Sequence, residues 1–171
     1  MIIKIPDKKG FMLIEAILAL GIIVVITTSL VSALISSFNN ANFSKDQNRA
    51  TAYAQEGLEI VRNFKDSDYY TFSFLATGTY CLPGGATFSQ TSQPGGNCRR
   101  NVASTFSREI YINQAGDDPR TGVTIVRCSD PGSVFIASVV LWSDTKCING
   151  ADCHRVELNS CFTNLNRVSG P

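Results

Sequence analysis

The chain has 171 residues, a formal net charge of +1 and 44% hydrophobic residues. This length fits one domain of ordinary size together with a separate apolar segment. A charge so close to neutral excludes the strongly basic surface with which proteins bind nucleic acid or anionic lipid, so nucleic acid is not expected as a partner.

The most apolar stretch covers residues 11–38, FMLIEAILALGIIVVITTSLVSALISSF, and Glu15 is its only charged residue. A run of this length can span a bilayer, which requires about 20 apolar residues. A carboxylate in such a segment costs about 2.5–3.5 kcal/mol at the centre of a bilayer, which makes Glu15 a candidate functional residue.

The lysines Lys4, Lys8 and Lys9 all precede the apolar run. By the positive-inside rule they keep the N-terminus in the cytoplasm, which predicts a single-pass membrane protein with an extracytoplasmic C-terminal domain. Two simpler interpretations remain open. A secretory signal peptide would have a shorter apolar core, and a plain membrane anchor would not need Glu15.

Residues 8–15, KKGFMLIE, resemble the class III signal of type IV prepilins and pseudopilins. The resemblance implies that residues 1–10 are a cytoplasmic leader and that a prepilin peptidase cuts between Gly10 and Phe11 and methylates the new N-terminus of Phe11. It also implies that Glu15 pairs with a terminal ammonium, its own or a neighbour's, inside a filament core. Such pairing is physically reasonable, because buried charges are tolerated when they are paired.

Further residues make the resemblance more specific. Many major pilins carry a helix-loosening proline where this chain has Ser32, and residues 54–63, AQEGLEIVRN, are similar to the helix of PilV-type minor pilins. The resemblance therefore implies a minor pilin of a type IV pilus, located in a cell-surface filament after assembly. The alternatives are a pseudopilin of a type II secretion system and a membrane-anchored extracellular binding module. The implied partners are the prepilin peptidase, other pilin subunits, the inner-membrane assembly machinery and membrane lipid.

Residues 39–66 are expected to continue the helix as the spine of a head domain. The segment 49–65 has the spacing of an amphipathic helix, and Gly57 in its apolar stripe indicates close approach of a strand, because glycine costs about 1 kcal/mol there against alanine. Glu56 and Glu59 are expected on the solvated face. The stripe consists of Ala50, Tyr53, Ala54, Gly57, Leu58, Val61 and Phe64.

Residues 67–171 are expected to form the head. Residues 69–75 predict a short strand or an extended connection, and 77–101, rich in Gly, Ser, Thr and Pro, predict a loop. The continuous apolar run 134–142 indicates a central strand covered on both faces. Short strands joined by turns predict an α+β fold in which a small antiparallel sheet packs on the helix, and the resemblance implies a pilin fold. The other expected strands contain Phe106, Ile110 and Ile112, then Val123 and Ile125, then Val156, Leu158 and Phe162.

All six cysteines follow the apolar segment, and an even number in an exported domain predicts a disulfide framework. Cys81 and Cys98 bracket the long loop, and Cys147 and Cys153 bracket the loop 143–152. Cys161 faces away from the helix, towards a covering loop, where Cys128 is a plausible mate. The expected pairs, among several that the count allows, are Cys81–Cys98, Cys128–Cys161 and Cys147–Cys153.

The sequence contains no Gly-rich phosphate loop, HExxH or GxSxG motif, so neither an enzyme nor a cofactor is expected. A zinc site is not expected either, since there is no CxxC and His154 is the only histidine, interpreted as an exposed loop residue. Asp117 and Asp118 are interpreted as part of a turn, because the ligand spacing of a known calcium loop is missing.

Overall fold

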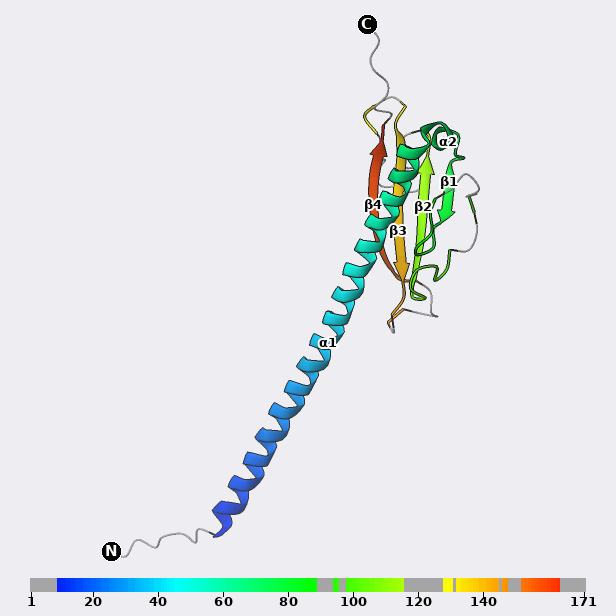
Figure 1. Ribbon diagram of the computed structural model, residues 1–171. Helices are drawn as coiled ribbons and strands as arrows, with labels where there is room; N and C mark the ends of the chain where they lie inside the picture. Colours follow the sequence, from blue (N-terminus) through cyan, green and yellow to red (C-terminus); the bar gives the residue numbers. More distant parts are fainter. Residues whose placement is uncertain are drawn as a thin grey trace, which may run out of the picture. The chain divides into compact units, whose positions relative to one another are not determined.

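The computed structural model describes residues 9–88, 94–95, 98–115, 128–130, 132–144, 146–147 and 152–163, with side chains from Leu13 onward. The chain divides into two compact units, Met1–Lys45 and Asp46–Pro171. Helix α1, Lys9–Ser67, belongs to both units (Figure 1). The prediction that the helix continues past the apolar run is confirmed.

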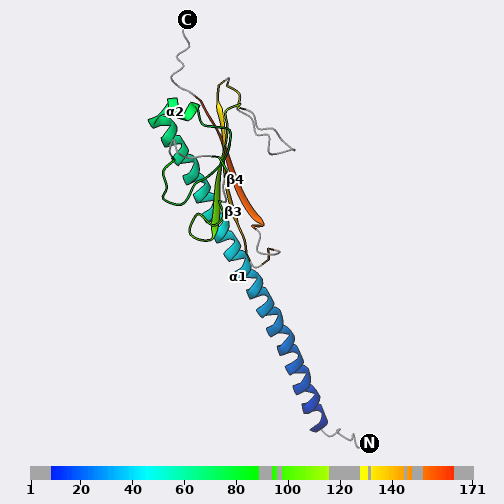
Figure 2. The ribbon, with the colours of Figure 1, turned by 90° about the vertical axis from the view of Figure 1, so that its right-hand side faces the viewer.

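In the second unit α1 packs on a sheet through one stripe of small and apolar side chains. Ala50, Ala54, Gly57 and Val61 are buried, whereas Gln55 and Glu59 are exposed. Viewed with the sheet nearly edge-on, this part of α1 covers one face of the sheet (Figure 2). The predicted amphipathic spine is therefore confirmed.

The sheet has four antiparallel strands in the order β1-β2-β3-β4. Their bounds are Gly78–Cys81 for β1, Phe106–Asn113 for β2, Val134–Trp142 for β3 and His154–Phe162 for β4. The α+β architecture expected from the sequence, with a long helix on a small antiparallel sheet, is present.

Strand β3 is covered on both faces, as its apolar run predicted. Ile136 lies in the main core with Val61 of α1. On the other face Phe135 and Ala137 are fully buried and form a smaller cluster with Tyr111, against which Cys128 packs. The two faces together explain why almost every residue of β3 is apolar.

The prediction of a short strand or extended connection at residues 69–75 is wrong, because a short helix, α2 (Tyr69–Ser73), forms there. Asp68 caps this helix, since its Oδ1 accepts a hydrogen bond from Thr71 N at 3.0 Å. Phe72 is buried in the main core. A capping carboxylate and one buried ring outweigh the β-propensity of the aromatic residues and threonine.

The prediction of a loop at residues 77–101 is also partly wrong, because strand β1 forms within this range. Tyr80 is 1% exposed, lies opposite Ile110 of β2, and donates a hydrogen bond from its hydroxyl to Ala76 O at 2.6 Å. Burial raises the pKa of Tyr80. The contacts of Tyr80 thus stabilise this four-residue edge strand. A strand this short has no alternating sequence pattern from which it could be predicted.

A turn precedes β3, since Ser133 N donates to Asp130 O at 3.1 Å and Gly132 has a φ of 82°. The strand expected around Val123 and Ile125, and the turn containing Asp117 and Asp118, lie outside the described residues.

Three disulfides connect the second unit, and they join the pairs expected from the sequence. Cys81 bonds Cys98, Cys128 bonds Cys161, and Cys147 bonds Cys153, over sequence separations of 17, 33 and 6 residues. No described cysteine is free. A small domain with a limited core gains stability from such cross-links.

We predict that Gly57→Ala lowers the free energy of unfolding by about 1–3 kcal/mol, the cost of overpacking a core, although alanine favours helix. A Cβ at this position would lie 2.6 Å from Ser138 Oγ and 3.0 Å from Ile110 Cδ1. Urea denaturation of the detergent-solubilised protein, followed by circular dichroism, measures the change.

Ser138→Ala provides the matched control. Ser138 Oγ is buried and has no hydrogen-bond partner among the described residues, so its removal alone should cost little. In the Gly57→Ala background the same change should restore most of the lost stability. A double variant no more stable than Gly57→Ala would contradict the close contact between α1 and β3.

Candidate functional site

The first functional surface is the apolar part of α1 in the first unit. Its large apolar side chains at residues 13–38 are each between 53% and 68% exposed. Among the described residues this is the one helix long and apolar enough to cross a membrane. An apolar surface of this extent requires lipid or other apolar helices to cover it.

Four of the hydroxyl groups in this surface are satisfied within the helix itself. Thr27, Thr28, Ser29 and Ser32 donate hydrogen bonds to carbonyl oxygens four residues earlier, at 2.8–3.0 Å. These side chains therefore need no partner outside the helix, and they are compatible with an apolar environment.

Glu15 is different from the hydroxyl groups. Its side chain is exposed, and no group among the described residues forms a hydrogen bond or an ion pair with it. Gly10 and Phe11 belong to the first turn of α1, with Lys9 as its first residue, and Lys8 lies outside the described residues. Glu15 is thus the one charge that an apolar environment around residues 13–38 would leave to be paired.

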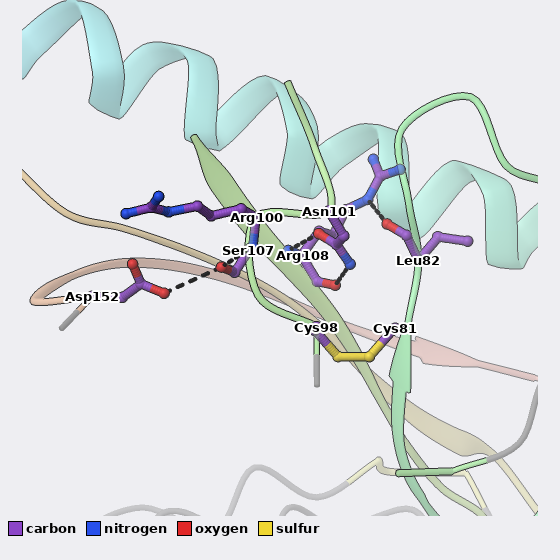
Figure 3. Close-up of a disulfide and its surroundings, with 8 residues drawn as sticks. All are labelled: Cys81, Leu82, Cys98, Arg100, Asn101, Ser107, Arg108 and Asp152. Atoms are coloured by element: carbon purple, nitrogen blue, oxygen red, sulfur yellow. Dashed lines mark hydrogen bonds between the residues drawn. A yellow bond between two sulfur atoms is a disulfide. The ribbon is translucent and has the colours of Figure 1, made fainter. Parts of the chain in front are cut away.

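The second feature is a buried cation in the head, which the sequence analysis missed. Arg108 of β2 is fully buried, and its Nε donates to Leu82 O at 2.9 Å (Figure 3). Its guanidinium also donates to two further backbone carbonyls, from Nη1 to Tyr53 O at 3.0 Å and from Nη2 to Pro83 O at 3.0 Å. Nη1 also lies 3.0 Å from Glu56 Oε2. Glu56 is therefore not simply solvated, as expected, but helps to hold α1 on the sheet.

The backbone of Arg108 is fixed as firmly as its side chain. Asn101 Oδ1 accepts from Arg108 N at 2.7 Å, and Asn101 Nδ2 donates to Arg108 O at 2.9 Å (Figure 3). Ser107 Oγ accepts from Arg100 N at 2.9 Å and donates to Asp152 Oδ2 at 3.1 Å. These bonds fasten the segment after Cys98 to β2 and β2 to the start of β4.

The third feature lies at the end of the sheet where Trp142 of β3 pairs with His154 of β4. The ring of His154 packs on Trp142 with centroids 5.3 Å apart, and its Nε2 lies 3.0 Å from Asp144 Oδ2. The sequence interpretation of His154 as exposed is wrong, since its side chain is 22% exposed and held between these two residues.

Hydrogen bonds also orient Asp144. Lys146 N donates to Asp144 Oδ1 at 2.8 Å. This bond, together with the neighbouring His154, lowers the pKa of the Asp144 carboxyl below its usual value. The carboxylate therefore stays ionised through the neutral pH range, with Oδ2 towards the imidazole.

The Cys147–Cys153 disulfide adjoins this pair. The candidate ligand atoms of Asp144, Cys147, Cys153 and His154 all lie within 4.8 Å of one another. With the disulfide closed, the two sulfur atoms are bonded to each other and cannot act as thiolate ligands. The sequence signal that could have indicated this cluster is the short spacing Asp144-x2-Cys147-x5-Cys153-His154.

Comparisons with protein-family models, curated proteins and solved structures found no match for this chain. The residues selected from the sequence belong to different units. Gly10, Phe11 and Glu15 lie at the start of α1 in the first unit, whereas all six cysteines lie in the second. The functional assignment therefore depends on the chemistry of each feature.

We predict that Arg108→Met lowers the free energy of unfolding by about 3–5 kcal/mol, the cost of removing one partner from a buried ionic network. Three carbonyls would lose their donor. Glu56→Gln should cost about 1 kcal/mol or less, because Glu56 is 42% exposed and such pairs contribute little. Urea denaturation measures both changes.

Arg108→Lys separates the contribution of the positive charge to stability from that of the hydrogen-bond geometry. Lysine keeps the cation but lacks the planar fork that reaches three acceptors, so it should lose most of what methionine loses. Equal losses for Glu56→Gln and Arg108→Met would show instead that the ion pair, and not the carbonyl contacts, holds α1 on the sheet.

Proposed function

We propose that this protein is a minor pilin or pilin-like subunit of a type IV pilus, cut by a prepilin peptidase and assembled through α1. The observation that carries the proposal is an exposed apolar helical surface whose only charge, Glu15, lies five residues after Gly10 of the sequence KKG and four after Phe11. The resemblance of residues 8–15 to the prepilin signal supports the same function.

Lipid alone would cover the apolar side chains, but it would not pair the carboxylate. Cleavage after Gly10 would create an ammonium on Phe11, four residues before Glu15. Residues four apart lie on the same face of a helix, about 6 Å apart along its axis. Processing would therefore supply the cation that Glu15 lacks, either within one subunit or between neighbours.

Packing of several such helices would then satisfy both requirements of this surface. Apolar side chains would cover one another, and Glu15 would set the axial register, because a subunit in another register would leave a buried charge unpaired. The proposed partners are accordingly the prepilin peptidase, the assembly machinery and other subunits with the same kind of helix.

The head suits an exported subunit. Three disulfides are typical of oxidising compartments, and the Arg108 contacts hold the spine of the head on the sheet. The helix is also continuous around Ser32, whose hydroxyl bonds Thr28 O. This continuity favours a minor subunit, or a type II secretion pseudopilin as the second candidate, over a major pilin with a helix-loosening proline.

Mass spectrometry of the N-terminal peptide tests the processing step. In cells with an active prepilin peptidase we expect the membrane-extracted protein to begin at Phe11 with a methylated amino group. The same strain without the peptidase gene should retain Met1. An intact leader in both strains would leave only a membrane-anchored domain.

Glu15→Ala tests assembly. The variant should insert and be cleaved normally, yet enter filaments at least about tenfold less, because the terminal ammonium would lose its partner at a cost of several kcal/mol. Sheared filaments quantified against membrane protein give the ratio. Glu59→Ala is the matched control, since it removes another carboxylate from an exposed position of α1 and should assemble normally. Normal incorporation of Glu15→Ala would refute the role of Glu15.

A further inference from the structure

We propose that opening the Cys147–Cys153 disulfide turns the end of the sheet into a zinc site with Asp144, Cys147, Cys153 and His154 as ligands. Thiolate, imidazole and carboxylate are the groups that bind zinc in proteins, and four of them complete a tetrahedral site. Their ligand atoms are already within 4.8 Å of one another.

The polar half of the site is already arranged for a metal. His154 Nε2 and Asp144 Oδ2 are 3.0 Å apart, close to the roughly 3.4 Å that separates such ligands in a zinc tetrahedron. Packing on Trp142 orients the imidazole, and the bond from Lys146 N to Oδ1 orients the carboxylate. Contacts of this kind around ligands are typical of metal sites.

The sulfur half needs a small rearrangement. The Cα atoms of Cys147 and Cys153 are 5.6 Å apart, and in a zinc site their sulfurs would separate to about 3.8 Å by side-chain rotation. Asp144 N donates to Cys147 Sγ at 3.2 Å, a bond that would stabilise a thiolate at this position. The backbone therefore need not move far.

Of the three disulfides this one costs the fold least to open. It closes the shortest loop, so its chain-entropy contribution is the smallest. Cys153 is exposed, which gives an attacking thiolate access to its sulfur. Accessibility thus separates this bond from Cys81–Cys98, in which Cys98 is 4% exposed. Cys161 is exposed as well, so the shorter loop is what separates this bond from Cys128–Cys161.

The reaction balances with a dithiol as the reductant. Two successive thiol–disulfide exchanges reduce the Cys147–Cys153 bond to two thiols and oxidise the dithiol to its disulfide. Zinc then displaces one proton from each thiol, and both protons go to solvent. Metal binding at this end of the head would thus depend on the redox state around the protein.

The test uses the full chain in detergent, treated with dithiothreitol until alkylation and peptide mapping show that Cys147 and Cys153, and not the other four cysteines, are reduced. We expect one zinc ion per chain, measured by competition with a chromogenic chelator. Cobalt should give the absorption of a tetrahedral thiolate complex. The oxidised protein should bind neither ion at the site.

Two variants decide the assignment. Cys147→Ser with Cys153→Ser should abolish zinc binding after the same treatment, and circular dichroism verifies its fold. His154→Gln, which keeps every cysteine, should weaken zinc binding at least tenfold and change the cobalt spectrum. Zinc binding that is absent from the reduced protein, or that both variants retain at full affinity, would overturn the proposal.

Discussion

The structure of the head depends on the burial of one cation. An arginine inside a core is tolerated only when its donors are satisfied, and Arg108 satisfies them with backbone carbonyls of α1 and of the segment after β1, together with Glu56. The positions of helix, segment and β2 are therefore coupled. Gly57 strengthens this coupling, because without a side chain it lets α1 approach Ser138 and Ile110 closely.

The two units differ in how their apolar side chains are covered. The second unit has its own core, a covered central strand and three disulfides, although Tyr70 and Phe74 stay exposed on it. In the first unit, α1 satisfies the hydroxyl groups of Thr27, Thr28, Ser29 and Ser32 with its own carbonyl oxygens but leaves its apolar side chains and Glu15 exposed. That difference is why the proposed function assigns assembly to the first unit and stability outside the cell to the second.

Long or strongly patterned elements were predictable, and short ones were not. The stripe on α1 and the apolar run of β3 extend over many residues, so their periodicity is unambiguous. Strand β1 has four residues and α2 has five, and each depends on a few specific contacts: those of Tyr80 with Ile110 and Ala76 O, and those of Asp68 with Thr71 N and of Phe72 with the core. Contacts of this kind decide short elements against local propensity.

The sequence by itself determined the apolar helix, its single carboxylate Glu15 and the amphipathic spine, because these follow from local spacing. It indicated the three disulfide pairs among the several that six cysteines allow, and the structure selected them. Only the tertiary structure decided the roles of Arg108 and His154. The carbonyl acceptors of Arg108 lie 25, 26 and 55 residues away in the chain, and such contacts between distant segments leave no local pattern. The residues around His154 are close in sequence, but its contacts with Trp142 and Asp144 form only when β3 and β4 pair.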